Sequence, residues 1–155
     1  MLVFAVETSC DETSVCIMRR NKTILSHIIY SQEIHKKHGG IVPELASRAH
    51  LEILQKITKK AFNKANLKPK DIDIFTATCG PGLIGALLVG STFTKSLSIG
   101  AKKPFIPINH LEGHLFSASF NNIGSLFGII GFIRGFTLGG CGVDFKTMDV
   151  ELRIN

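Results

Sequence analysis

The sequence predicts an α/β protein with a mixed sheet and flanking helices. Three short runs of β-branched and apolar residues open the chain, with polar turns between them. Two segments with helical periodicity then alternate with further strand-like runs. Short turns favour antiparallel neighbours, whereas a connecting helix favours parallel ones. The expected order is therefore βββαβαβα in one layered domain.

The first half of the chain is expected to contain three strands and a long helix. The strands cover residues 2–6, 13–18 and 23–30, and Pro43 begins the helix after the break at Gly39 and Gly40. Apolar side chains recur on this helix at three- and four-residue steps and predict one buried stripe: Ala46, Ala49, Ile53, Ile57 and Ala61.

The second half is expected to alternate strand and helix. A strand over residues 72–78 leads through the turn at residues 80–82 into a helix over 83–98, whose small residues predict close packing. A short strand over 105–108 follows, and a last helix runs from His110 to about residue 120.

Charge and cysteine content narrow the class of protein. The 155 residues carry a net charge of +6, with many lysines between residues 56 and 70. Such a cluster is either the solvated face of a helix or a nucleic-acid surface. Four cysteines without a CxxC pair, and no signal peptide, predict a cytoplasmic protein. The apolar stretch over 123–136 is too short to span a membrane, so no membrane contact is expected.

The polar loop at residues 7–12 is the first candidate site. It joins two predicted strands and contains hydroxyl groups together with the adjacent carboxylates Asp11 and Glu12. Amide and hydroxyl groups at such a turn can bind phosphate, and a carboxylate can hold the cation that neutralises it. The residues alone leave a plain polar hairpin equally open.

The second candidate is the glycine pattern G-x-G-x-x-G over residues 80–85, which follows a strand and opens a helix. A dinucleotide site also needs an acidic residue about 20 positions further on, and that region is apolar. Pro81 moreover lacks an amide hydrogen for a phosphate. A tight turn before a closely packed helix explains these glycines better.

The third candidate is the pair His110 and His114. On a helix, residues four apart lie about 6 Å apart on one face, close enough to bind one metal ion. Packed histidines without a metal remain the alternative. The metalloprotease motif H-E-x-x-H needs glutamate at position 111, where this chain has Leu111 and then Glu112, so the spacing argues against a protease.

Four motifs together resemble one family. They lie at residues 7–13, 39–48, 80–83 and 110–114, and in order and spacing they are similar to the tRNA threonylcarbamoyladenosine synthase subunit TsaD, formerly called a glycoprotease. The resemblance covers residues 1 to about 122. It implies the N-terminal lobe of an actin-like ATPase fold, of ribonuclease-H type.

The resemblance also implies an activity and a site. The family transfers a threonylcarbamoyl group from its adenylate to N6 of adenosine 37 in tRNAs that read codons starting with A. His110 and His114 would bind iron or zinc. Further residues would lie at the adenylate (or ATP): Asp11 and Glu12 at its nucleotide edge, and Ser9, Cys10 and Thr13 at the substrate. Partners would be tRNA, a TsaB-like paralogue near the helix over 83–98 and a TsaE-like ATPase.

The resemblance stops before the C-terminus. Residues 123–155 hold seven of the 15 glycines and lack the family's Ser-Gly-Gly-His loop and second lobe, which carries the third metal ligand. We therefore expect a lobe over 1–122 and a glycine-rich tail over 123–155 that looks frame-shifted or truncated. An isolated lobe would expose an apolar face and self-associate. The alternative function is a non-catalytic remnant or partner-binding module of the same fold.

Overall fold

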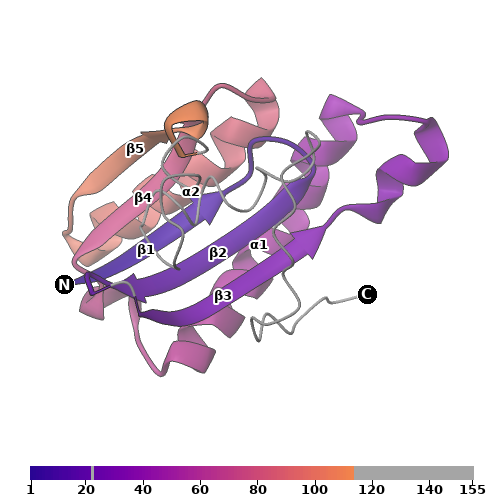
Figure 1. The fold of residues 1–155 in the computed structure, drawn as a ribbon. Coiled ribbons are helices and arrows are strands. Elements are labelled where there is room, and N and C mark those ends of the chain that lie inside the picture. Colours follow the sequence, from indigo (N-terminus) through magenta and orange to yellow (C-terminus); the bar gives the residue numbers. More distant parts are fainter. Residues whose placement is uncertain (22, 114–155) are drawn as a thin grey trace.

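A computed structural model describes residues 1–21 and 23–113. Their elements follow the predicted order (Figure 1). In chain order they are β1 (Leu2–Glu7), β2 (Glu12–Arg19), β3 (Ile24–Ser31), η1 (Glu33–His38), α1 (Pro43–Ala65), η2 (Pro69–Asp71), β4 (Ile74–Gly80), α2 (Ile84–Ala101) and β5 (Phe105–Asn109). Residues 110–113 are helical, as expected for the start of the last helix. The short 3-10 helices η1 and η2 were not predicted from the sequence.

The five strands form one mixed sheet in the order β3-β2-β1-β4-β5. β1, β2 and β3 pair antiparallel through short turns, whereas β4 and β5 run parallel to β1. The parallel strands follow long helical connections, because a parallel neighbour requires the chain to return to the same end of the sheet. The prediction of a mixed sheet is confirmed.

Both helices lie on the same side of the sheet (Figure 1). Alternate side chains of the strands point toward them and form the main apolar core with α1. Phe4 lies at its centre, with ring centroids 5.3 Å from Phe62 of α1 and 5.5 Å from Phe75 of β4. The intervening side chains form a smaller cluster on the opposite face: Val3, Ala5, Cys16, Met18 and Ile108.

The buried stripe of α1 differs partly from the predicted one. Ala46, Ile57 and Ala61 are buried as expected, but Ala49 and Ile53 are only half-buried. His50 and Leu54 occupy the centre of the stripe instead. Each lies one position, or about 100° around the helix, from the predicted residue. A stripe defined by apolar residues alone does not include a histidine, although His50 is buried here.

The helix α2 is long and apolar enough to cross a membrane by length and composition alone. Its small residues Ala86, Gly90, Thr94 and Ser98 are nevertheless buried at four-residue steps, which places one face against the protein. It connects the parallel neighbours β4 and β5. This is the place of a crossover helix in a layered α/β domain. The stretch over 123–136 lies outside the described residues.

Candidate functional site

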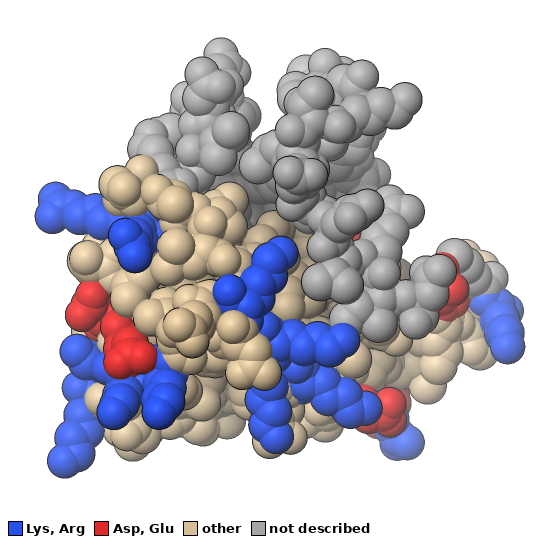
Figure 2. All heavy atoms as spheres, turned by 90° about the horizontal axis from the view of Figure 1, so that it is seen from below, with Lys and Arg blue, Asp and Glu red and all other residues tan. Residues whose placement is uncertain are grey.

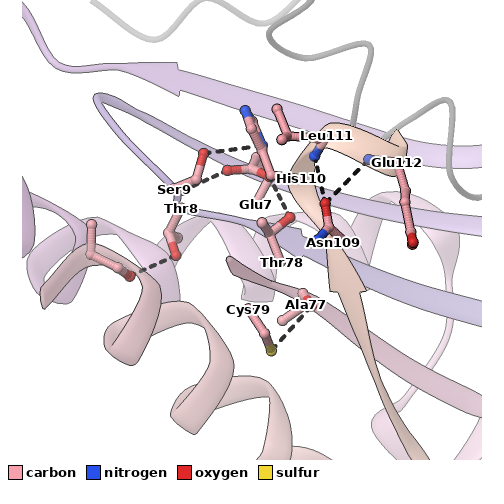
Figure 3. A network of polar contacts seen from close by, with 11 residues as sticks. Glu7, Thr8, Ser9, Ala77, Thr78, Cys79, Asn109, His110, Leu111 and Glu112 are labelled. Carbon is pink, nitrogen blue, oxygen red and sulfur yellow. Dashed lines mark hydrogen bonds and ion pairs between the residues drawn. The ribbon is translucent and has the colours of Figure 1, made fainter. Parts of the chain in front are cut away.

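The candidate site lies where three parallel strands end. Glu7 is the last residue of β1, Thr78 lies near the end of β4, and His110 directly follows β5 (Figure 3). Because β1, β4 and β5 are parallel neighbours, their carboxyl ends meet at one edge of the sheet. Ligands of open α/β sheets bind in this position.

Glu7 is the centre of this site, with 2% of its surface exposed. Its Oε1 accepts a hydrogen bond from the Ser9 amide at 2.5 Å, and its Oε2 accepts one from the Thr78 hydroxyl. His110 Nδ1 lies 3.4 Å from the same Oε2 and 3.3 Å from Ser9 Oγ. The residue after β5 thus reaches across β4 to the end of β1.

These contacts keep Glu7 ionised. Burial alone would raise the pKa of its carboxyl group, but hydrogen bonds from His110, Ser9 and Thr78 outweigh this and lower the pKa below its ordinary value. The site therefore holds a buried negative charge beside an imidazole. Such a charge persists only where donors surround it.

Asn109 fixes the backbone that carries His110. Its Oδ1 accepts hydrogen bonds from the amides of Leu111 at 2.9 Å and Glu112 at 3.3 Å. These are the second and third residues of the helical turn, so Asn109 is its N-cap. The cap makes His110 the first residue of the helical turn, next to the end of β5.

The opposite side of the loop is packed against α2. Thr8 Oγ1 donates to the Ala86 carbonyl at 2.8 Å, and the Ser9 carbonyl accepts from the Leu83 amide at 2.8 Å. A Cβ atom at Gly82 would lie 2.7 Å from the Ser9 carbonyl oxygen, and one at Gly90 would lie 2.1 Å from Thr8 Oγ1. The glycines at 82 and 90 thus permit close packing, as expected for this turn and helix.

His50 connects the same loop to α1. It is fully buried, and its Nε2 lies 3.0 Å from the Cys10 carbonyl oxygen while its Nδ1 lies 2.7 Å from Thr13 Oγ1. A carbonyl oxygen only accepts, so Nε2 carries the hydrogen and Nδ1 accepts from the Thr13 hydroxyl. Burial lowers the pKa of His50 to about 4, against a raising effect of Glu7 and Asp11. The ring is therefore neutral at pH 7.

The structure separates the predicted site residues into two groups. Ser9 contacts His110, whereas Cys10 contributes its carbonyl group to His50 and Thr13 is buried against the same ring. The carboxylates follow at the start of β2. There the Asp11 carbonyl accepts from the Gln32 amide, and Glu12 Oε1 accepts from Ser31 Oγ at 3.0 Å. His114 lies outside the described residues.

The residues present fit a metal ligand at His110. A metal-binding histidine characteristically has a carboxylate, carbonyl or water on its other ring nitrogen, and here Glu7 lies beside Nδ1. The ring is 12% exposed, so it is held but not sealed. Within residues 1–21 and 23–113, no group of three His, Cys, Asp or Glu side chains gathers to form a complete site.

The sequence alone assigns no role to four residues of this region. Asn109 carried a usable signal, because asparagine directly before a helix favours an N-cap. Glu7 directly follows the predicted buried strand over 2–6, and a carboxylate at the carboxyl end of a buried strand is a signal for a site. Thr78 and His50 carried none, because their roles depend on contacts with residues 71 and 40 positions away in the chain.

Comparison with known proteins identifies the family. The family model described as TsaD, tRNA N6-adenosine threonylcarbamoyltransferase, matches residues 23–127. A curated relative of that name from Trichodesmium erythraeum is 55% identical over 116 residues, which is 74% of this chain and 35% of the relative. One from Chlamydia pneumoniae is 52% identical over 118 residues, or 76% and 34%. The chain thus spans about a third of the length of these relatives.

A solved structure shares the fold. YeaZ from Pseudomonas aeruginosa superposes with a TM-score of 0.58 at 15% identity, covering 78% of this chain and 49% of that one. With the strand order β3-β2-β1-β4-β5, this confirms the predicted actin-like ATPase fold of ribonuclease-H type. The chain belongs to the tRNA N6-adenosine threonylcarbamoyltransferase family.

Proposed function

We propose that this chain provides the metal-binding and adenylate-binding lobe of a tRNA N6-adenosine threonylcarbamoyltransferase. The reaction moves a threonylcarbamoyl group from threonylcarbamoyl-adenylate to N6 of adenosine 37, in tRNAs that read codons starting with A. One observation carries the proposal. This chain is 55% identical to a family member over 116 residues, and in it Glu7 and Ser9 contact His110, the first histidine of the pair His110 and His114.

In this proposal, His110 and His114 hold one iron or zinc ion. Imidazole nitrogens are ligands that both metals accept. The ion supplies an anchor for the adenylate and Lewis acidity toward its carbonyl group. Glu7 and Ser9 orient the imidazole, and Asn109 holds the helical turn that begins with it.

The loop after β1 is proposed as the adenylate site. Ser9 already lies at the histidine, and Asp11 and Glu12 continue the loop into β2. We place these two carboxylates at the nucleotide edge, and Cys10 beside them as part of the loop wall. Thr13 stabilises this loop indirectly, because it bonds His50, which in turn bonds the Cys10 carbonyl group.

The tRNA is proposed to bind the end of the lobe where α1 leads into η2. Figure 2 shows many Lys and Arg side chains on this side of the molecule, with fewer Asp and Glu side chains between them. Exposed lysines lie in the second half of α1 and at η2: Lys56, Lys59, Lys60, Lys64, Lys68 and Lys70. Such side chains attract the phosphate backbone without reading its sequence, so binding weakens steeply as salt rises.

The test is a tRNA modification assay with purified components. The full chain is incubated with tRNA, threonine, bicarbonate, ATP, a TsaB-like paralogue and a TsaE-like ATPase, and nucleosides are analysed by mass spectrometry. The proposal expects threonylcarbamoyladenosine, which His110→Ala abolishes and Glu52→Gln, at an exposed position of α1 outside the four motifs, leaves unchanged. A folded chain that forms no product with all partners present would contradict the proposal.

A second candidate is a partner-binding module, and exposed apolar side chains favour it. Ile84 and Leu88 of α2 are 79% and 59% exposed, and Leu51 of α1 is 65% exposed. The two helices meet where Gly85 approaches Ser47, and Leu88 and Leu51 follow this contact by about one turn. An apolar ridge across two helices is typical of a protein interface.

The partner-binding candidate is tested by association. Light scattering of the full chain, alone and with a TsaB-like paralogue, reports self-association and hetero-association separately. Leu88→Asp is expected to weaken both by at least about tenfold, because a buried charge would replace apolar contact. Retained association together with an inactive modification assay would favour the module over the enzyme.

A further inference from the structure

The contacts of Glu7 point to a role beyond filling the sheet edge. A carboxylate only accepts hydrogen bonds, and donors from three residues converge on this one: Ser9, through its amide and its hydroxyl, the Thr78 hydroxyl and the His110 ring. The three come from the loop after β1, from β4 and from the turn after β5. Neighbouring strands are about 4.8 Å apart, so His110 leans over β4 to reach Glu7.

This geometry decides which nitrogen of His110 carries the hydrogen. Among the described residues, Nδ1 lies 3.4 Å from Glu7 Oε2 and 3.3 Å from Ser9 Oγ. If Nδ1 were an acceptor for the Ser9 hydroxyl, its lone pair would face a carboxylate and be repelled. If Nδ1 carries the hydrogen, both oxygens can accept from it. The second arrangement suits Nδ1, the Glu7 carboxylate and the Ser9 hydroxyl together.

We propose that Glu7 is a positioning residue that holds His110 in the Nδ1–H form, so that Nε2 presents the lone pair for a metal ion. The inference deepens the proposed function and rests on its metal site. Glu7 acts on the ligand and does not itself bind the ion. Its burial gives the imidazole one orientation, because the carboxylate is fixed by Ser9 and Thr78.

Nuclear magnetic resonance on the metal-free chain tests the tautomer directly. The full chain is labelled with 15N, and the ring nitrogens of His110 are recorded at a pH where its own titration shows the ring to be neutral. We expect a protonated Nδ1. A protonated Nε2 in the native chain would overturn the proposal whether or not the chain binds metal.

The variant Glu7→Gln removes the charge and keeps the shape. The Ser9 amide can only donate and so holds the glutamine carbonyl oxygen at the position of Oε1, which leaves the NH2 group at the position of Oε2. There it faces the Thr78 hydroxyl, which can turn to accept, and the His110 ring, where it favours the other tautomer. The expected result is a shift toward Nε2–H and a 10- to 100-fold weaker Zn²⁺ affinity, of the order seen for such outer contacts. A folded Glu7→Gln chain that keeps Nδ1–H and native affinity would overturn the proposal.

Two controls separate positioning from general damage to the edge. Thr78→Val removes another donor of the same carboxylate oxygen without touching the ring, and Ser9→Ala removes the other neighbour of Nδ1. Both are expected to keep Nδ1–H, and a flip in either would overturn the assignment to Glu7. A native chain with Nδ1–H that binds no Zn²⁺ would instead contradict the proposed metal site, which keeps the two failures distinct.

Discussion

The two sides of the loop from Glu7 to Thr13 have different tasks. On one side, Glu7 and Ser9 contact His110 at the strand ends. On the other, Thr8 bonds the first turn of α2, and Thr13 and the Cys10 carbonyl bond His50 of α1. One short motif therefore contains both a candidate site and the attachment that holds it in place.

His50 and His110 show the difference most clearly. Each has a ring nitrogen near this loop, but His50 is fully buried, with one nitrogen donating to a carbonyl group and the other accepting from a hydroxyl group. His110 is 12% exposed and faces a carboxylate. A neutral, fully bonded imidazole is a structural link, whereas an imidazole with a carboxylate behind it suits ligand binding.

The largest expected effect is a loss of stability in acid through His50. An unfolded histidine takes up a proton near pH 6.5, whereas folded His50 does so only near pH 4. Between these values the unfolded chain binds more protons than the folded one. The free energy of unfolding therefore falls as pH falls from 6.5 toward 4. The shift corresponds to about 3 kcal/mol at most. Urea unfolding at a series of pH values measures it.

The matched variant for this prediction is His50→Gln, whose amide can bond both Cys10 and Thr13 without titrating at these pH values. Burial also lowers the pKa of His27 to about 4, with Lys64 adding to the effect, so His27 contributes a similar slope in both chains. The variant should lose stability less steeply in acid. Equal slopes would contradict the role given to His50.

Close packing of α2 on the loop gives the next largest effect. Gly90→Ala would place a methyl group against the buried Thr8 side chain and cost about 1–2 kcal/mol of stability, even after the gain in helix propensity. Gly100→Ala, on the same helix with open space around it, should gain about 0.5 kcal/mol. Denaturant titration compares them. A stabilising Gly90→Ala would show that this contact is loose.

The fold could be predicted almost completely because its signals are local. Polar turns marked the three antiparallel strands, and the helices α1 and α2 were recognised by their periodicity and small residues. The helical connections predicted parallel strands in a mixed sheet, whereas the strand order, with β4 beside β1, comes from the structure. The 3-10 helix η1 was not predicted because its buried residue, His35, is polar and bonds the buried N-cap residue Gln32, at 2.9 Å.

The site could be predicted only in part. His110 is a candidate from its spacing to His114, and Ser9 from the family resemblance, but the role of Glu7 depends on Thr78 and His110, which reach it only after the parallel strands align. Thr13 was expected at the substrate, and nothing in its local sequence distinguishes a hydroxyl that faces a ligand from one that faces His50. Strand alternation decides the direction, and a one-residue difference in register reverses it.

Removing the cap at Asn109 should have a moderate effect confined to the site side. Asn109→Ala leaves the Leu111 and Glu112 amides without their shared acceptor and should cost about 1 kcal/mol. Hydrogen exchange of these two amides should quicken, and Zn²⁺ affinity should fall severalfold because the turn that begins with His110 loosens. Asn109→Asp, which keeps an acceptor, should restore both; no rescue would mean that the side chain acts otherwise.

The smallest but sharpest test compares two neighbours on opposite sides of the loop. Thr8→Val keeps the shape and loses the buried bond to the Ala86 carbonyl, so it should cost about 1 kcal/mol of stability and leave Zn²⁺ affinity unchanged. Ser9→Ala loses a buried hydroxyl whose contact with His110 Nδ1 is long, at 3.3 Å, so it should cost about 0.5 kcal/mol of stability while weakening Zn²⁺ binding about twofold. Unfolding and metal titration of both chains decide the matter. If the two variants gave the same pattern, the loop would act as one unit, and its division into a site side and an attachment side would be wrong.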